Sequence, residues 1–186
     1  MPETGGVLVS VTATVPGPAE LAEATAVYAA AFREAPYRED ERQAEAFAER
    51  IRRYAGERDG FRLALARDDE GRLAGLALAV LARPGDWWRD TAAAALTGED
   101  VRRWLDGLCL EVVHVAVPPA LQHRGIGTRL HDALISGRPA PTGVLSCHPD
   151  AIPAQRLYLR QGWTLLTEEF RTAPGQLRYW LMARDL

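Results

Sequence analysis

The segment Leu110-Glu111-Val112-Val113-His114-Val115-Ala116-Val117 leads, after Pro118-Pro119, into Gln122-His123-Arg124-Gly125-Ile126-Gly127. The first run is rich in β-branched residues, which predicts a strand. Glycines punctuate the turn behind it, and Leu130, Ala133 and Leu134 then follow at helical spacing. We therefore expect a strand, a glycine turn and a helix. Such a turn leaves backbone N–H groups at a helix start without partners and lets a bulky anion approach them, which favours phosphate binding.

Length, composition and charge limit the class of protein. The chain has 186 residues, of which 47% are hydrophobic and 25% are charged, so we predict one globular domain over residues 1–186. A formal net charge of −3 argues against a nucleic-acid partner. No apolar run is long enough to cross a bilayer, which argues against a membrane partner. Residues 1–10 lack the pattern of a secretion signal, so the expected location is cytoplasmic.

The two cysteines are expected to be buried thiols rather than metal ligands. Cys109 and Cys147 lie far apart in the sequence, and neither has a second cysteine or a histidine at metal-ligand spacing. We therefore expect no metal. Nothing near Cys147 suggests an activated thiolate.

The first half of the chain predicts two helices and three strands. A strand is expected over 7–15, and Leu21, Thr25, Tyr28 and Phe32 recur on one helical face until Pro36. A second helix is expected over about 41–54, after an irregular linker at 33–40. Two apolar runs, 61–67 and 72–81, flank an acidic turn and predict a hairpin.

The second half of the chain is predicted to alternate helices and strands. Residues 84–103 are the least regular and predict a short helix. The helix behind the glycine turn should end near Gly137, and a strand is expected over 142–147. Asp150 is expected to cap a helix over about 151–160. A strand pair over 163–170 and 176–182 completes the prediction.

Two motifs in register resemble those of the GCN5-related N-acetyltransferase (GNAT) family. Val117-Pro118-Pro119 and the run from Gln122 to Gly127 match its Q/R-x-x-G-x-G/A motif after a strand. Downstream, Ala154, Tyr158, Gly162 and Trp163 match its A-x-x-x-Y-x-x-x-G-F/W element. Glycine motifs alone mostly mark turns, so the second element carries much of the resemblance.

The resemblance implies an α/β (α+β) fold that binds acetyl-CoA as a co-substrate. Its central sheet would be mixed and mostly antiparallel, with about six or seven strands and about four helices. Two strands would splay into a V-shaped slot, where the main chain at Val115 and Val117 pairs with the pantetheine arm. The turn would hold the pyrophosphate. Its residues in that role are Gln122, His123, Arg124, Gly125, Gly127 and Thr128.

The same resemblance points to two catalytic side chains. Glu111 stands where histone-acetylating members carry their general base, and a carboxylate on a core strand requires an explanation. Tyr158 matches the position that donates a proton to the leaving thiolate. His114 competes with Glu111 as the base because an ordinary histidine titrates near working pH. Strand alternation sets it on the opposite face, so we expect a structural histidine. A water chain is the third alternative.

Acceptor sites in the family are usually built from the segment between the first two helices and from loops near the slot. The aromatic candidates here are Phe32, Tyr37, Trp87 and Trp88. Glu39 and Asp40 lie beside them and could hold a cationic amine. We expect them instead to form the acidic start of a helix that faces water.

The predicted activity is transfer of an acetyl group from acetyl-CoA to a primary amine by direct attack in a ternary complex. A small-molecule acceptor is expected. The alternatives are a non-catalytic acyl-CoA-binding module and a protein N-terminal acetyltransferase. Dimers are common in the family, which leaves a homodimer open. One departure concerns Ala151, because many members carry an asparagine there that contacts the cofactor.

Overall fold

A seven-stranded mixed sheet organises the computed structural model, with the strand order β1-β2-β3-β4-β5-β7-β6. The structure describes residues 6–137 and 139–186, so half of the N-terminal segment read for a secretion signal lies outside it. The strands are β1 (Leu8–Thr12), β2 (Arg62–Arg67), β3 (Leu73–Ala82), β4 (Cys109–Ala116), β5 (Thr142–Cys147), β6 (Thr164–Phe170) and β7 (Tyr179–Asp185). Strand β4 pairs with β5 in parallel, and the pairs β1–β2, β2–β3, β5–β7 and β6–β7 are antiparallel. The expected α+β class with a mostly antiparallel sheet is confirmed.

The helices are more numerous than expected. They are α1 (Pro18–Phe32), α2 (Glu41–Glu57), α3 (Trp87–Ala94), α4 (Gly98–Asp100), α5 (Ile126–Ile135) and α6 (Ile152–Arg160). A π-helical turn, η1 (Val101–Leu105), follows α4, and a 3-10 turn, η2 (Pro119–Leu121), precedes α5. The surplus over four helices comes from the irregular stretch before β4, which folds as α3, α4 and η1 rather than as one short helix.

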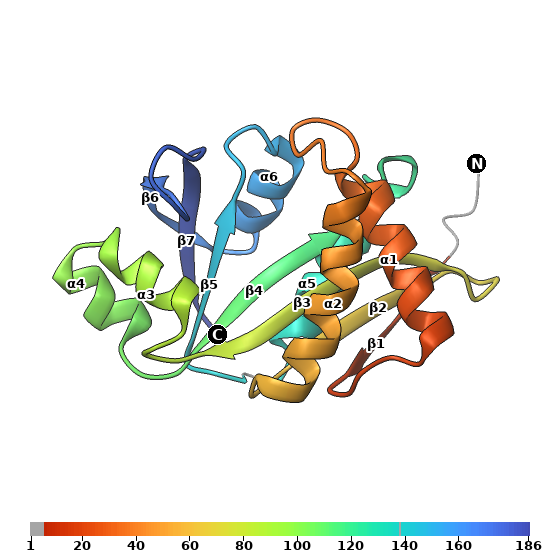
Figure 1. Ribbon diagram of the computed structural model, residues 1–186, viewed down its shortest axis with the longest axis horizontal. Coiled ribbons are helices and arrows are strands. Elements are labelled where there is room, and N and C mark those ends of the chain that lie inside the picture. The colour runs from red at the N-terminus through yellow and green to blue at the C-terminus, as the bar shows by residue number, and fades with distance from the viewer. Residues whose placement is uncertain (1–5, 138) are drawn as a thin grey trace. The chain divides into compact units, whose positions relative to one another are not determined.

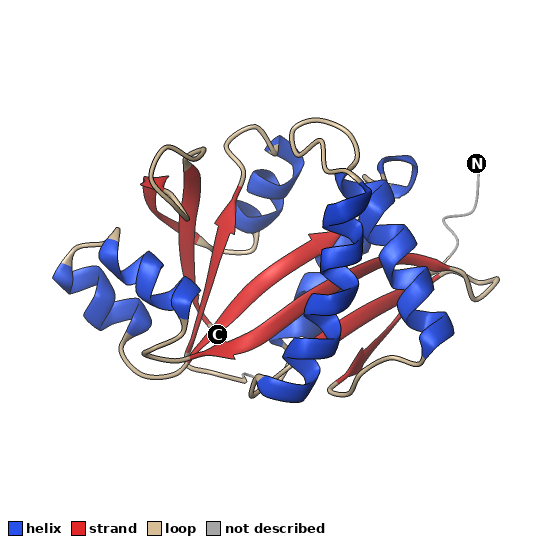
Figure 2. Ribbon diagram, viewed as in Figure 1, coloured by secondary structure: helices blue, strands red, loops and turns tan. Residues whose placement is uncertain are grey.

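The chain divides into two compact units, each of which is built from two segments. The first unit comprises residues up to 80 and 114–136, and the second comprises 81–113 and 137–186. In the first unit, α1 and α2 pack against each other in front of the strands, and α5 packs behind them against β1 and β2 (Figures 1 and 2). Its buried aromatic residues come mainly from α1 and α2.

The second unit has a core between its strands and the segment from α3 to η1. Its buried residues are Ala82, Ala92, Leu105, Cys109, Val144, Phe170, Leu181 and Ala183. Trp88, Trp104 and Tyr179 pack against this core as partly buried side chains. Helix α6 ends at Arg160, and Gly162 follows its C-cap with a φ of 80°, a left-handed conformation that favours glycine. Trp163, directly after it, is buried.

Several predicted boundaries differ from the structure. Strand β1 ends at Thr12 instead of residue 15, where the Thr12 hydroxyl accepts a hydrogen bond from the N–H of Thr14 and turns the chain. Strand β7 begins three residues later than expected, at Tyr179, because a turn closed by Gln176 N–H on the Ala173 carbonyl precedes it. The Asp150 cap was also wrong. Ala151 is the N-cap of α6, while the N–H of Asp150 donates to His148 Nδ1.

Candidate functional site

The turn between β4 and α5 contains two residues with left-handed backbone conformations. His123 has a φ of 62° and Gly125 a φ of 77°. A Cβ on Gly125 would meet no atom within 4 Å, so the φ angle rather than crowding favours glycine there. Gly125 is the N-cap of α5 and has no side chain with which to accept from the first turn. The N–H groups of the first turn of α5 therefore receive no side-chain cap from Gly125, and such groups favour an anion.

Side chains of the turn bind its own backbone. The Gln122 amide donates to the Val117 carbonyl at 3.0 Å, which ties the turn to the end of β4. The Arg124 guanidinium donates to the Ala120 carbonyl at 3.2 Å while the side chain stays exposed. The first contact explains a glutamine in the motif as a brace. The second leaves a positive charge beside the helix N-terminus, which favours an anionic ligand.

Helix α5 lies unusually close to the sheet of the first unit, and Gly75 on β3 makes this approach possible. A Cβ at Gly75 would stand 3.0 Å from Leu130 Cδ1, 3.1 Å from Ile126 Cγ2 and 3.1 Å from the Ala116 carbonyl. The last of these is a backbone atom of β4. Gly75 therefore fixes the start of α5 against the strand that leads into the turn.

Strand β4 carries both candidate bases. It runs unbroken from Cys109 to Ala116, so Glu111 and His114 stand on opposite faces. Glu111 is buried, pairs in register with Val144 and shares its face with Cys109. Burial, and then the Glu111 carboxylate, raise the pKa of the Cys109 thiol to about 12. Farther along, Val115 and Val117 are only partly buried.

His114 belongs to a polar cluster enclosed by aromatic rings. Arg50 Nη1 donates to His114 Nε2 at 2.7 Å, and the rings of Tyr28, Phe32 and Phe47 lie between 5.2 and 5.9 Å from the imidazole centroid. Burial, and then the Arg50 charge, lower the pKa of His114 to about 3. The ring is therefore neutral at physiological pH, and its Nε2 lone pair is already engaged. This arrangement suits the expected structural histidine and not a base.

Glu39 and Asp40 are adjacent acids with different environments. Asp40 caps α2, since its carboxylate accepts from the N–H groups of Arg42 and Gln43, and Gln43 returns a hydrogen bond to the Asp40 N–H. Glu39 instead hydrogen-bonds Tyr28, and its Oε2 is buried. The expectation that both acids face water was wrong for Glu39, because the turn after α1 directs it back to that helix. The N–H of Glu39 donates to the Phe32 carbonyl at 2.9 Å.

The four aromatic acceptor candidates fall into two groups. Phe32 is buried, and the ring of Tyr37 stands edge-on to it at 4.7 Å, so these two lie together in the first unit. Trp87 and Trp88 belong to the second unit. Trp88 packs edge-on to Phe170 at 5.7 Å, whereas Trp87 is 65% exposed. The two adjacent tryptophans on α3 thus differ in exposure, and Trp87 is the one that faces solvent.

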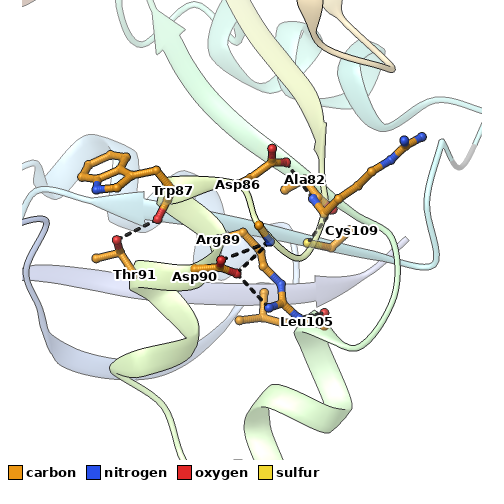
Figure 3. Close-up of polar contacts among 10 residues, drawn as sticks. Ala82, Asp86, Trp87, Arg89, Asp90, Thr91, Leu105 and Cys109 are labelled. Carbon is orange, nitrogen blue, oxygen red and sulfur yellow. Dashed lines mark hydrogen bonds and ion pairs between the residues drawn. The ribbon is translucent and has the colours of Figure 1, made fainter.

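A polar network fixes the helix that carries these tryptophans. Figure 3 shows the Arg89 guanidinium between the Asp90 carboxylate, at 3.1 Å, and the Leu105 carbonyl, at 2.7 Å, while the Trp87 indole points away. The Cys109 thiol faces the Ala82 carbonyl in the same view. Arg89 therefore joins α3 to η1, and Trp87 contributes exposed surface without being part of the network.

Tyr158 is buried on α6 against the residue that ends the second motif. Its ring stands 5.9 Å from that of Trp163, and its carbonyl accepts from the Trp163 N–H at 3.0 Å. Trp163 in turn covers Gly143 of β5, where a Cβ would stand 2.9 Å from its Cη2 atom. The motif spacing thus packs α6 onto β5 and sets the depth of Tyr158 within the second unit.

Sequence reasoning missed three polar groups. Tyr28 was read only as a helix-face residue and Arg50 was not singled out, and only their contacts with Glu39 and His114 reveal the cluster. Gln155 braces the start of α6 by donating to the carbonyls of His148 and Pro149. A lone glutamine on an otherwise apolar helix face was the available signal for this last brace.

Burial also keeps the thiol of the second cysteine unreactive. It raises the pKa of Cys147 to about 12, so the thiol is protonated at physiological pH. Among residues 6–137 and 139–186, the side chains include no group of three or more histidine, cysteine, aspartate or glutamate residues placed to hold a metal ion. The same residues include no helix that is both long and apolar enough to span a membrane.

Comparison with known proteins gives a family and a set of similar folds. The model of the acetyltransferase (GNAT) family matches residues 24–163. One similar structure is described as a histone acetyltransferase HPA2 and related acetyltransferase from Corynebacterium glutamicum, 18% identical over 95% of this chain and 96% of that one, with a TM-score of 0.62. A mosquito arylalkylamine N-acetyltransferase-like protein is 12% identical over 97% and 100%, with a TM-score of 0.63.

A third similar structure is the NatC complex bound to a Gag peptide and CoA. Its matching chain is 12% identical over 97% of this chain and 98% of that one, with a TM-score of 0.66. At these identities, the likeness shows a shared fold. No curated protein sequence matches the chain.

Proposed function

The chain belongs to the acetyltransferase (GNAT) family, and on this premise we propose that it transfers an acetyl group from acetyl-CoA to the primary amine of a small molecule. The observation that carries the proposal is the turn from Gln122 to Thr128. Its left-handed residues and the uncapped start of α5 present backbone donors that suit a diphosphate. The partly buried Val115 and Val117 would pair with the pantetheine arm through their backbones.

The proposed reaction is a direct attack on the thioester. The neutral amine nitrogen forms a C–N bond with the acetyl carbon, and the C–S bond breaks as the tetrahedral intermediate collapses. Glu111 would accept the proton that the amine loses, either directly or through water. Tyr158 would donate its hydroxyl proton to the departing thiolate. Both side chains are buried, Glu111 on β4 and Tyr158 on α6, where the two sequence motifs place them, and this supports the proposed roles.

The structural neighbours are named for acceptors of several classes. One is an arylalkylamine N-acetyltransferase-like protein and another an agmatine N-acetyltransferase, whereas NatC is bound to a peptide. We favour a small amine because the ring of Tyr37, which stands edge-on to Phe32, is partly exposed in the segment between α1 and α2. A protein N-terminus remains the alternative acceptor, and a homodimer the proposed assembly to be tested.

An assay of thiol release tests the proposal. Purified protein is mixed with acetyl-CoA and a panel of small amines and short peptides, and free CoA is measured over time. The chain contains no lysine, so its own side-chain amines do not contribute to the signal. Turnover with a small amine supports the proposal. Tight CoA binding without turnover on any amine would favour the non-catalytic module, and preference for peptides would favour the N-terminal acetyltransferase.

A further inference from the structure

Strand β4 is held in different ways at its two ends. From Cys109 to Val112 it pairs in register with β5, and it continues beyond this register to Ala116. The later residues adjoin β3, where Gly75 lets the Ala116 carbonyl approach. They lead into the turn before α5. The geometry of this end of β4 therefore depends on contacts from outside the β4–β5 pair.

Arg50 on α2 connects this end of β4 to the two long helices of the first unit. Its Nη1 atom donates to His114 Nε2 at 2.7 Å, and the same side chain hydrogen-bonds Tyr28 on α1. The rings of Phe32 and Phe47, together with that of Tyr28, surround the imidazole. One guanidinium thus projects from α2 and contacts side chains of both α1 and β4.

The contact between Arg50 and His114 is a strong one for a neutral acceptor. A charge away from water is costly unless hydrogen bonds compensate it, and a hydrogen bond from a charged donor is stronger than one between neutral groups. Burial and the Arg50 charge lower the pKa of His114 to about 3, so the ring offers Nε2 as an acceptor and carries no competing positive charge. The contact therefore restrains the imidazole and, with it, the adjoining backbone of β4.

The restrained backbone is the part of β4 that the proposed function uses. Val115 follows His114 directly, and the main chain at Val115 and Val117 would pair with the pantetheine arm. Side chains of a strand leave the sheet through its faces, whereas the backbone groups lie in its plane. A side chain on the helix-covered face can therefore fix the strand without approaching the cofactor. Arg50, His114 and the turn before α5 all belong to the first unit.

We propose that Arg50 is a positioning residue for the cofactor, which holds the end of β4, through His114, in the conformation that pairs with pantetheine. This inference rests on the proposed acetyltransferase function and deepens it. Arg50 takes no part in the proton transfers, so its loss should weaken CoA binding and leave the chemical step unchanged.

Calorimetric titration with CoA tests the inference. Arg50→Met keeps an apolar stem and removes the charge and the donors. We expect it to raise the dissociation constant of CoA roughly tenfold, the fold-change that corresponds to about one hydrogen bond. In the thiol-release assay, the KM for acetyl-CoA should rise while kcat stays the same. Arg50→Lys, which keeps a charged donor, should retain part of the affinity.

Two control variants separate positioning from a general loss of stability. Ile51→Val removes one buried methyl group from the same helix and lowers the stability without removing a polar contact. Arg42→Met removes an exposed arginine from α2. Both variants should bind CoA within about twofold of the unmodified protein. Urea unfolding measures the stability of these variants and of Arg50→Met.

A double-mutant cycle tests whether Arg50 acts through His114. His114→Phe removes the acceptor and keeps an aromatic ring, and by itself it should also weaken CoA binding. The double variant should bind CoA no more weakly than Arg50→Met alone, because both changes remove the same contact. Additive losses of affinity would contradict the inference.

Hydrogen exchange of the unliganded protein measures the restraint on the strand without any cofactor. The backbone N–H groups of Val115 and Ala116 should together exchange roughly tenfold faster in Arg50→Met, whereas those of Ala64 and Leu65 on β2 should not. Equal acceleration in both strands, or none in β4, would overturn the inference.

The calorimetric results can overturn it as well. An affinity for CoA that survives Arg50→Met would do so, and so would an equal loss of affinity in Ile51→Val. If the unmodified protein binds no CoA, the proposed function fails separately. The exchange comparison then still decides whether Arg50 holds the end of β4.

Discussion

At position 114, strand β4 sets an imidazole among three aromatic rings and against one guanidinium. Both the low polarity and the Arg50 charge oppose protonation, with burial the larger cause. The histidine therefore contributes a neutral acceptor for Arg50. This arrangement lowers the unfolding free energy only at acidic pH.

Stability should depend on His114 between neutral and acidic pH. The unfolded histidine takes up a proton near pH 6.5, whereas the folded one does so only near pH 3, so stability falls as the pH drops through this window. This group alone should cost about 2 kcal/mol of unfolding free energy between pH 7 and pH 5. In His114→Gln, whose amide oxygen can still accept from Arg50, urea unfolding should show a correspondingly smaller loss. An unchanged pH dependence would mean that the ring is protonated in the folded state.

Removing the hydroxyl of Tyr158 should affect catalysis without affecting cofactor binding. If Tyr158 protonates the thiolate, Tyr158→Phe should lower kcat by roughly a hundredfold or more. The ring packing on Trp163 is retained, so the affinity for acetyl-CoA in a calorimetric titration should stay within about twofold. A variant with near-normal turnover would exclude the proposed acid.

For Glu111 the pH profile is the informative measurement. Glu111→Gln should lower kcat at pH 7 by roughly a hundredfold, and the rate should recover in part toward pH 10, where more of the alkyl amine is already neutral. The comparison is the ratio of variant to unmodified protein at each pH. A ratio that stays constant with pH would indicate that this buried carboxylate is structural.

Among the elements, helix α5 is positioned against the sheet by a residue without a side chain, Gly75 on β3. Gly75 lets Leu130 and Ile126 approach β3, and the start of the helix follows from that contact. Strand β3 is otherwise built from apolar residues with side chains, so this one position determines how deeply the helix is seated.

Adding one methyl group at Gly75 should therefore lower both the stability of the protein and its affinity for CoA. Gly75→Ala should lower the unfolding free energy by about 1–3 kcal/mol, because a Cβ would crowd a backbone carbonyl as well as side chains. It should also weaken CoA binding, measured by calorimetry. The matched change Gly56→Ala lies on an exposed part of α2 with nothing within 4 Å and should instead stabilise by about 0.4–1 kcal/mol. Equal effects of the two changes would contradict the role of Gly75.

Local signals determine how far elements can be predicted from the sequence. Strand β5 occupies the predicted residues 142–147, because its apolar run is bounded by clear turn residues. The turn before α5 was recognisable from its glycines for the same reason. Within 84–103 one short helix was predicted where the structure has α3 and α4, since Arg89 on the Leu105 carbonyl and Trp88 on Phe170 hold that segment through tertiary contacts. Glu39 was misjudged because its partner Tyr28 lies on the preceding helix, α1, a contact that the local sequence does not indicate.

For the whole molecule, the two compact units do not follow one another along the chain. Strand β3 and strand β4 each contribute residues to both units, with the divisions after residues 80 and 113. A chain that crosses between units within its strands is expected to unfold cooperatively. The number of unfolding transitions therefore tests the prediction that residues 1–186 form one domain.

Calorimetry of the unmodified protein should show a single transition. At a CoA concentration about one hundred times the dissociation constant, it should shift upward as a whole by about 5–10 °C, because ligand binding then adds about 2.7 kcal/mol of stability. An equal concentration of ATP serves as the control for simple phosphate binding. Two transitions, of which CoA moves only one, would show that the units unfold independently.

Asp40 caps α2 whereas Glu39 hydrogen-bonds Tyr28, and this difference has a consequence for protein engineering. Since the start of α2 relies on the carboxylate of Asp40, residue 39 can be varied without loss of that cap. A library confined to residue 39 should consequently yield proteins that keep helix α2, as circular dichroism would show.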